Sequence, residues 1–484
     1  MVLFLCTIFC HCTLILYYCK RDRLKNLTLE NIANACNGTL FLINGDDAER
    51  EASSVIIDSR KSEKDCVFIA TRGERVDGHS FIKQVWNNGA LAVICEEIPE
   101  EVEGNYIHVK DSFQALKDIA EFYRLQLDVK IVGIAGSVGK TSTKEMVASV
   151  LSQKFSVQKT QGNFNNEVGV PLTIFTIDES HEVAVVEMGI SDFNEMSRLS
   201  KIVKPDICVL TNIGPCHLEN LKDLDGVLKA KSEIFESMNP SGFVVLNGDD
   251  EKLRLVKRVN DKTPDYFGID EKNDVFAKNI VSKGLLGSEC NIVTKEGKFD
   301  AYIPLPGKHH IMNALAATKV GIILKMTLPE IAKGIASVKS TQGRSNIIET
   351  DKYILIDDCY NANPKSMKAA IDLLNQADSA KIAVLGDMFE LGENEEELHS
   401  EVGEYVSAID PNLLICVGKL SANMYESANL KSGKKVYFET LDFAMDKIEE
   451  LLENVRKDAS EKKPAVLIKA SHGMHFEKIV DLLK

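Results

Sequence analysis

Hydrophobic and polar positions divide most of the chain into short apolar runs and amphipathic helical stretches. Between residues 130 and 250, the helical pattern "TSTKEMVASVLSQKF" follows the run "KIVGIAG", and further apolar runs come later: "EVAVVEMG", "ICVLTNIG" and "GFVVLNGDD". Short apolar runs that alternate with helices are typical of a mostly parallel sheet with helices on both faces. We therefore predict a central α/β domain over residues 106–340, which also contains the helical stretches "HHIMNALAATKVGIIL" and "LPEIAKGIASV".

A second series of the same kind follows "TQGRSNII". Its apolar runs are "YILIDDC", "KIAVLGDM", "LLICVG", "KVYFE" and "AVLIKAS", separated by "SMKAAIDLLNQA", "EELHSEVGEYVSA" and "FAMDKIEELLENV". This pattern predicts a doubly wound α/β domain over residues 341–484. Upstream, "SVIIDSR", "CVFIA" and "LAVIC" predict a smaller α/β domain over residues 25–105, and "DSFQALKDIAEFYRLQL" predicts a helix leading to the central domain.

Residues 1–24 stand apart from these domains. The run "MVLFLCTIFCHCTLILYYC" is almost wholly apolar and is followed by "KRDR". A signal peptide would need a basic start and a small-residue cleavage site, and neither is seen. A membrane anchor is long enough to form, and the basic group after it would keep the rest cytoplasmic. We favour a third interpretation, a start placed too far upstream, with a cytoplasmic protein beginning near Leu24 and no stable membrane association.

Composition narrows the class of protein. With 484 residues, 44% hydrophobic and 27% charged, the chain resembles a soluble globular protein of several domains. A net charge of −15 argues against a nucleic-acid-binding protein, which normally has a basic surplus. The 12 cysteines include no C-x-x-C pair, so we expect reduced thiols and neither a zinc knuckle nor a thioredoxin-type motif.

The stretch "GIAGSVGKTSTKE" joins the strand at residue 130 to the helix that follows it. Its end, G-K-T, matches a phosphate-binding loop, but the common spelling would place a glycine at Ile134. The glycines are instead spaced three apart, at 133, 136 and 139. A loop of this kind directs backbone N–H groups and a helix N-terminus at an anion, while Lys140 reaches phosphates and Thr141 holds Mg²⁺. We therefore predict that a nucleotide binds at Gly136, Ser137, Val138, Gly139, Lys140, Thr141 and Ser142.

Other polar residues follow predicted strands and face the same edge of the sheet. Glu187 ends "VAVVEMG", where a carboxylate could coordinate Mg²⁺. His217 comes just after "LTNIG" and could be structural or part of a site. Asp358 follows "YILID" and suggests a polar ligand site. The chain has no Asn-Lys dipeptide, so the guanine-reading motif of GTPases is absent.

Two further segments are ambiguous from the residues alone. The stretch "QGNFNNEVGVP" is a loop by composition, and its asparagines could contact a ligand or simply cap the loop. Lys231, in "VLKAKSEIF", is expected on physical grounds alone to be a solvated helix lysine.

Taken together, these motifs resemble the Mur ligases, ATP-dependent enzymes that form amide bonds in peptidoglycan precursor synthesis. The resemblance covers residues 25–484 in family order, and the family spells its phosphate loop with glycines three apart. It continues through "TQGNFNNEVGVPLT", "EMG", "TNIGPCHLE", "AKSEIF", "LNGDD", "LPGKHHIMNALAA", "GRSNII", "DDCYNANPKSM", "LGDMFELGE" and "KASHGM". The stretch "YNANPKSM" is most similar to members that add D-alanyl-D-alanine to UDP-N-acetylmuramoyl-tripeptide.

The resemblance implies roles for particular residues. It implies ATP and Mg²⁺ as cofactors, with Lys231 carbamylated by CO₂ and acting as a metal ligand beside Thr141, Glu187 and His217. Catalytic roles fall on Lys140, Lys231 and His217. Further ATP contacts are implied at Asn247, Asn313, Arg344 and Asp358. Substrate contacts are implied at Ser59, Arg60, Asn163, Asn165, Asn166, Tyr360, Asn361 and Asn363.

Two alternatives remain open at this point. Another ATP-dependent ligase of the superfamily, such as a folylpolyglutamate synthase, would share the phosphate loop. A membrane-tethered phosphate-loop module would instead account for residues 1–19. The chain also departs from the family at "KASHGM", where His472 replaces the usual arginine, so an arginine contact to substrate there is in doubt.

Overall fold

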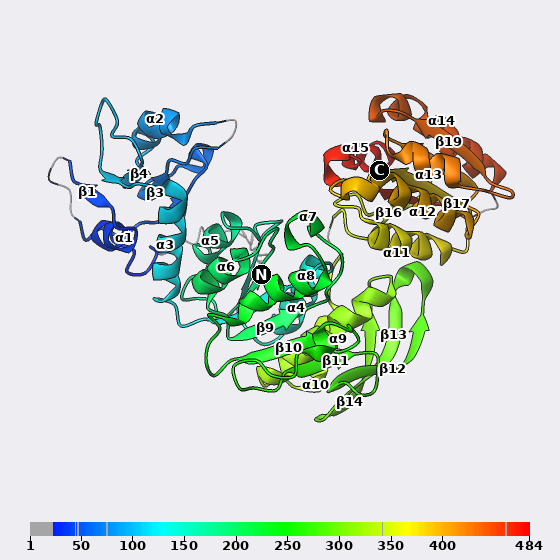
Figure 1. Ribbon diagram of the computed structural model, residues 1–484, viewed down its shortest axis with the longest axis horizontal. Helices are drawn as coiled ribbons and strands as arrows, with labels where there is room; N and C mark the ends of the chain where they lie inside the picture. Colours follow the sequence, from blue (N-terminus) through cyan, green and yellow to red (C-terminus); the bar gives the residue numbers. More distant parts are fainter. Residues whose placement is uncertain (1–22, 44, 46–47, 74–75, 341, 460–461) are drawn as a thin grey trace, which may run out of the picture. The chain divides into compact units, whose positions relative to one another are not determined.

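The computed structural model describes residues 23–43, 45, 48–73, 76–340, 342–459 and 462–484 (Figure 1). The chain divides into two compact units, one ending at Gln126 and one running from Leu127 to Lys484. The prediction for residues 1–24 falls almost entirely outside the described residues. In the parts that are described, every helix is too short or too polar to span a membrane.

The first unit contains a five-stranded sheet with strand order β1-β5-β4-β3-β2. Strands β2 to β5 are parallel to their neighbours, and β1 is antiparallel to β5. Because β5 pairs with both β4 and β1, the sheet continues past the sequence-based boundary at residue 105. The elements are β1 (Thr39–Phe41), β2 (Ser54–Ile56), β3 (Cys66–Ile69), β4 (Ala92–Cys95), β5 (Tyr106–His108), α1 (Leu29–Ala35), α2 (Ile82–Asn87) and α3 (Ser112–Arg124).

The second unit begins with a nine-stranded sheet of order β14-β13-β12-β11-β10-β9-β6-β8-β7. Its strands are β6 (Lys130–Ala135), β7 (Val157–Lys159), β8 (Val183–Glu187), β9 (Ile207–Leu210), β10 (Phe243–Asn247), β11 (Asp265–Gly268), β12 (Val275–Ser282), β13 (Ser288–Thr294) and β14 (Gly297–Ile303). Its helices are α4 (Lys140–Leu151), α5 (Gly169–Ile174), α6 (Glu195–Val203), α7 (Leu218–Leu221), α8 (Leu224–Ser232), α9 (Lys308–Ile323) and α10 (Leu328–Ala336).

The mostly parallel sheet predicted for this region is confirmed from β7 to β12, but β13 and β14 extend it in the antiparallel sense. Along β13, buried and more exposed residues alternate, as in a strand with one face toward water. Such a strand leaves no continuous apolar run in the sequence. This is why the antiparallel extension was not predicted.

A six-stranded sheet of order β15-β16-β20-β17-β18-β19 completes the second unit. Only β15 is antiparallel to its neighbour, so the predicted doubly wound pattern is confirmed. The elements are β15 (Asn346–Glu349), β16 (Ile354–Asp357), β17 (Lys381–Gly386), β18 (Leu413–Val417), β19 (Lys434–Phe438), β20 (Ala465–Lys469), α11 (Pro364–Asn375), α12 (Glu395–Ser407), α13 (Ser421–Ser427), α14 (Leu441–Asp458) and α15 (Glu477–Leu483).

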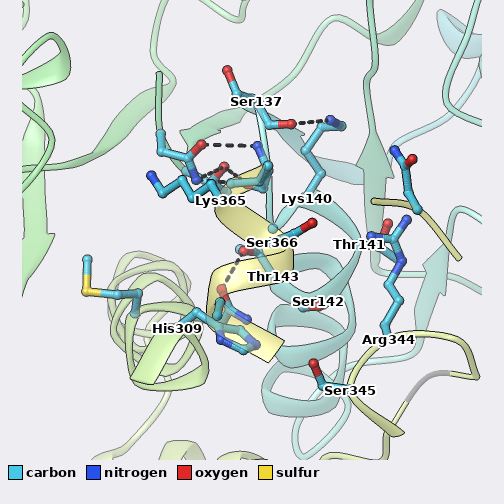
Figure 2. Close-up of a pocket in the computed structure, with 18 of the residues that line it drawn as sticks. Ser137, Lys140, Thr141, Ser142, Thr143, His309, Arg344, Ser345, Lys365 and Ser366 are labelled. Atoms are coloured by element: carbon cyan, nitrogen blue, oxygen red, sulfur yellow. Dashed lines mark hydrogen bonds between the residues drawn. The ribbon is translucent and has the colours of Figure 1, made fainter. Parts of the chain in front are cut away.

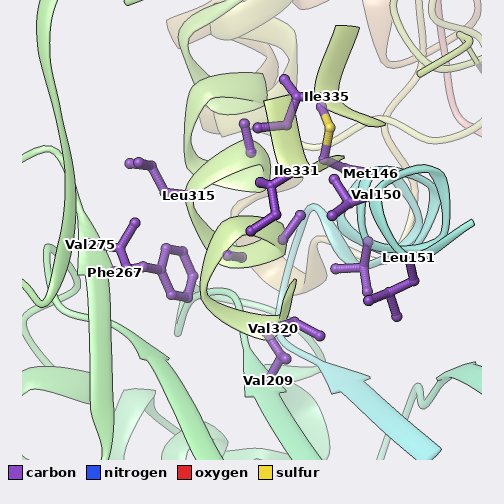
Figure 3. Close-up of a cluster of buried hydrophobic side chains, with 14 of the residues drawn as sticks. Met146, Val150, Leu151, Val209, Phe267, Val275, Leu315, Val320, Ile331 and Ile335 are labelled. Atoms are coloured by element: carbon purple, nitrogen blue, oxygen red, sulfur yellow. The ribbon is translucent and has the colours of Figure 1, made fainter. Parts of the chain in front are cut away.

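The core beside the nine-stranded sheet supports the helix that follows the phosphate loop. Helices α4, α9 and α10 pack together there: Figure 3 shows Val150 of α4 near Ile331 of α10, with Leu315 of α9 on the side of Phe267 and Val275. Helix α9 is apolar around most of its surface, and buried residues follow one another along it. A helix of this kind is stable only inside a protein. The position of α4 is therefore fixed by packing on its far side.

Truncating this core should destabilise the second unit. Leu315 has no exposed surface, so Leu315→Ala is expected to cost about 2–5 kcal/mol of unfolding free energy through lost burial and a residual cavity. Urea denaturation followed by circular dichroism measures the shift. Leu286→Ala is the matched control, because Leu286 is 73% exposed. Equal effects of the two substitutions would contradict the assignment of Leu315 to the core.

Candidate active site

A cavity of about 610 Å³ opens at the carboxyl ends of strands from both sheets of the second unit. Around it lie the N-terminus of α4, the strand ends after β8, β9 and β10, helix α9 and the N-terminus of α11 (Figure 2). It brings together most of the predicted site residues: Ser137, Val138, Gly139, Lys140, Thr141, Ser142, Asn163, Asn165, Glu187, Asn247, Asn313, Arg344, Asp358, Tyr360, Asn361 and Asn363.

The phosphate loop has a shape that only glycine permits at two positions. Gly139 has φ +80° at the start of α4, and Gly136 has φ +149°. A Cβ on Gly136 would lie 2.0 Å from the Thr211 hydroxyl. That hydroxyl donates to the Val138 carbonyl at 2.7 Å, and the Val138 N–H donates to the Asn212 side chain at 3.1 Å. The end of β9 therefore holds the loop in place without a ligand.

Lys140 folds back over this loop. Its ammonium donates to the Gly136 carbonyl at 3.0 Å and to the Ser137 carbonyl at 3.4 Å, the second of which is drawn in Figure 2. Burial lowers the pKa of Lys140, the Arg344 guanidinium lowers it further, and the Glu187 carboxylate partly opposes the change. Because the charges of Lys140 and Arg344 repel each other, an anion bound near both would be favoured. The arrangement fits the predicted phosphate site.

Glu187 lies beneath the loop at the end of β8 and is 1% exposed. Its Oε1 accepts from the Thr141 hydroxyl at 3.1 Å and from the Asn165 amide at 2.8 Å. Its Oε2 has no hydrogen bond, and among the described residues it is the only side-chain oxygen or nitrogen fully shielded from solvent of which this is true. Carboxylate and hydroxyl oxygens are the ligands that Mg²⁺ prefers. These residues therefore fit the predicted metal, although the described part of the chain contains no group of three or more His, Cys, Asp or Glu suited to hold one.

Lys231 is buried, with 2% exposure, so its interpretation as a solvated helix lysine is wrong. Its helix α8 packs against α6 and presents the ammonium to the interior. No hydrogen bond or ion pair to this ammonium occurs among the described residues. Burial lowers the pKa of Lys231 to about 8, and the charge of Lys140 contributes.

His217 lies near Lys231, but neither residue lines the cavity. His217 precedes α7 in a left-handed conformation, with φ +49°. Burial lowers its pKa, and the charges of Lys231 and Lys140 add to this effect. These three side chains therefore form one electrostatic group beside the phosphate loop.

The predicted substrate residues have different surroundings. Asn166 does not line the cavity, and its side-chain oxygen caps α5 by accepting from Val168 and Gly169. Asn363 lines the cavity and also caps α11, accepting from the Ser366 N–H at 2.9 Å. Ser59 and Arg60 belong to the first unit, where Ser59 is buried and Arg60 pairs with Asp58.

The six-stranded sheet contributes a second charged group to the cavity. The Lys469 ammonium contacts Asp358 Oδ2 at 2.6 Å and donates to the Asn361 carbonyl at 2.9 Å. The Arg344 guanidinium lies 4.1 Å from the centre of the Tyr360 ring, whose other neighbour is His472 at 5.5 Å. His472 thus lies beside a predicted substrate residue even though it replaces the family arginine.

Several lining residues were missed by the sequence analysis: Thr143, Asn212, Asp249, Asp250, His309, Lys365, Ser366 and Lys469. Lys469 could have been found, because it ends a predicted strand, "AVLIKAS", as Glu187 does and as Asp358 nearly does. The others carry no such signal. His309, for example, comes next to His310 at the start of an apolar helix, and only the fold shows which of the two reaches the cavity.

The Lys469–Asp358 pair should be strongly coupled. Removing one member leaves a buried charge without its partner, so Lys469→Met is expected to destabilise the second unit by about 3–5 kcal/mol. The double variant Lys469→Met with Asp358→Leu should recover much of this loss. Urea denaturation of all four forms measures the coupling, and additive effects would contradict it.

Three family models match the chain: "Mur ligase family, catalytic domain" over residues 51–124, "Mur ligase middle domain" over 134–321 and "Mur ligase, glutamate ligase domain" over 343–472. A relative from Bacillus subtilis (strain 168), UDP-N-acetylmuramoyl-tripeptide–D-alanyl-D-alanine ligase, is 38% identical over 94% of this chain and 98% of its own.

Solved structures give the same result. A crystal structure of MurF from Acinetobacter baumannii has 31% identity and a TM-score of 0.86, covering 96% of this chain and 99% of that one. MurF ligase from Thermotoga maritima in complex with ADP has 29% identity and a TM-score of 0.77, covering 89% of this chain and 96% of that one. The chain belongs to the Mur ligase family.

Proposed function

We propose that this chain is an ATP-dependent ligase that joins D-alanyl-D-alanine to UDP-N-acetylmuramoyl-tripeptide. The products are the UDP-linked pentapeptide, ADP and phosphate. The observation that carries the proposal is a phosphate loop that shares one cavity with the carboxyl edge of the six-stranded sheet, in a chain similar along its length to ligases of that name. The expected location is the cytoplasm.

The chemistry begins with activation of a carboxylate. An oxygen of the tripeptide's terminal carboxylate attacks the γ-phosphorus of ATP, and ADP leaves. The amine of D-alanyl-D-alanine then attacks the acyl phosphate, and the tetrahedral intermediate expels phosphate and forms the amide. Lys140 would neutralise charge on the transferring phosphoryl group. Closure of the cavity around bound substrates would keep water from the acyl phosphate.

We assign residues to these steps as follows. The phosphates would contact Gly136, Ser137, Val138, Gly139, Lys140, Thr141 and Ser142, and the rest of ATP would contact Asn247, Asn313, Arg344 and Asp358. The substrates would contact Asn163, Asn165, Asn166, Tyr360, Asn361 and Asn363, with Ser59 and Arg60 for the uridine nucleotide. Residues 25–105, 106–340 and 341–484 would serve the UDP end, ATP and the dipeptide.

The expected metal ligands are Thr141, Glu187, His217 and Lys231. Mg²⁺ bound there would offset negative charge on the phosphate oxygens. The orphaned Oε2 of Glu187 supports this assignment.

A carbamate on Lys231 would add an anionic ligand to this set. Carbamylation requires a neutral amine and a site that stabilises the resulting anion. The buried Lys231 has a pKa near 8 and no partner of its own, and the Lys140 charge favours an anion beside it. His217, its other neighbour, would be neutral because its pKa is lowered.

A direct assay tests the function. The purified protein is given ATP, Mg²⁺, D-alanyl-D-alanine and UDP-N-acetylmuramoyl-tripeptide, and mass spectrometry detects the pentapeptide. We expect one ADP for each amide formed. ATP hydrolysis that does not depend on the dipeptide, without any pentapeptide, would exclude the proposed reaction.

A further inference from the structure

Lys144 is a buried lysine that the proposed chemistry does not use. It lies on α4, one turn after Lys140, and is 1% exposed. Its ammonium donates to the Thr160 carbonyl at 2.8 Å and lies 3.2 Å from Glu145 Oε1. It also lies 3.8 Å from Glu187 Oε2, beyond hydrogen-bonding distance but close enough to neutralise that charge.

The Glu187 oxygen that lacks a hydrogen bond therefore still has a cation nearby, the Lys144 ammonium. Oε2 lies on the side of Lys144, whereas Oε1 lies on the side of Thr141, the other predicted metal ligand on this loop. Glu187 also interacts with the charge of Lys140. The single buried carboxylate of Glu187 thus interacts with two ammonium groups. A metal ion binding without nucleotide would be repelled by both of them.

The neighbouring carboxylate does not change this balance. Glu145 pairs with Lys159 through its second oxygen, so it too is shared between two lysines. The group as a whole contains two carboxylates, Glu145 and Glu187, and three ammonium groups, Lys140, Lys144 and Lys159. Counted over these five side chains, and without a carbamate on Lys231, the net charge is positive.

We propose that Lys144 acts as a resident cation that prevents divalent metal from binding at Glu187 on its own, so that metal enters only with the nucleotide. The phosphates of ATP or ADP would supply the negative charge that the free site lacks. Lys144 would then determine specificity for the metal–nucleotide complex over free metal. Its bonds to Thr160 and Glu145 keep it in place, so it would not leave when the metal binds.

The test uses Mn²⁺ as the probe, followed by electron paramagnetic resonance of the full-length protein without nucleotide. The wild-type protein is expected to bind Mn²⁺ no more tightly than millimolar, and ADP should make binding much tighter. Lys144→Met should bind Mn²⁺ alone at least tenfold more tightly than wild type. Adding Glu187→Gln to Lys144→Met should abolish this gain, because the gain depends on that carboxylate.

Two further variants separate charge from packing. Lys144→Gln removes the charge but can still donate to Thr160, and it should reproduce the tighter binding if Lys144→Met fails to fold. Lys154→Met, at an exposed lysine beyond the end of α4, should leave Mn²⁺ binding unchanged. A purely structural role for Lys144 would alter stability but would not tighten metal binding in either variant.

Three results would overturn the proposal: micromolar Mn²⁺ binding by the nucleotide-free wild type, no tightening in Lys144→Gln, or a gain that survives Glu187→Gln. The inference rests on the proposed function for the identity of the anion. The two can fail separately, because Mn²⁺ binding is measured without substrates and pentapeptide formation is measured on the wild type alone.

Discussion

Lys140→Met is expected to lower kcat for pentapeptide formation by about 10²–10³-fold, the usual cost of removing one group that stabilises charge in a transition state. The Lys140 ammonium lies over the phosphate loop, where it donates hydrogen bonds to two carbonyls of that loop. A phosphoryl group in the loop would replace those carbonyls as its partner. Nothing else on α4 can take over this role, because Lys144 is held below by Thr160 and Glu145.

Stability measurements distinguish this loss from a folding defect. The half-buried Lys140 has a lowered pKa, so its charge costs free energy in the nucleotide-free protein, and Met should be tolerated. ADP with Mg²⁺ should raise the Tm of wild type, as a ligand of the native state does, and should raise that of Lys140→Met much less. Lys154→Met again serves as the control. If Lys140→Met kept a normal kcat, the proposal that the phosphate loop takes part in the reaction would be contradicted.

Much of the fold could be predicted because parallel strands buried on both faces leave continuous apolar runs. The runs at 130–135, 183–187 and 381–386 all became central strands. The same strand predictions located Glu187 and Asp358 in the site, because residues at the carboxyl ends of parallel strands lie along one edge of the sheet. Strand prediction failed for β13 and β14, where one face is exposed and the apolar run disappears.

The site was harder to predict where the chemistry depends on burial. Lys231 and Lys144 look like ordinary helix lysines in the sequence, because neighbours distant in the chain make them interior. Lys231 is buried where its helix α8 packs against α6, and Thr160 and Glu187 lie against Lys144. The pattern of neighbouring residues in the sequence does not predict contacts with residues distant in the chain. Only the resemblance to a known family pointed to Lys231, and nothing in the sequence pointed to Lys144.

Lys231→Met is expected to abolish ligation and at the same time to stabilise the protein. A lysine pKa moved from 10.5 to about 8 corresponds to roughly 3 kcal/mol against the charged form in the folded state. In CO₂-depleted buffer below pH 8, Met should therefore raise the unfolding free energy by about 1–3 kcal/mol. As pH rises from 8 to 10.5, the folded wild type releases its proton before the unfolded chain does, so its stability increases and the difference disappears.

The proposed carbamate on Lys231 would give this prediction a second readout. Wild type supplied with ¹³C-bicarbonate should show a carbamate carbon by NMR, and Lys231→Met should lack it. Lys229→Met, two residues earlier on the same helix, should keep both the carbamate and the activity. A lysine with a purely structural role would not lower the stability of the protein below pH 8. Lys231 is expected to lower it and still to be required for turnover. If Lys231→Met kept normal kcat, Lys231 would have no part in the reaction. If wild type gave no carbamate signal but Lys231→Met still lost activity, the lysine would act as an amine. The proposed metal ligands would then be Thr141, Glu187 and His217 only.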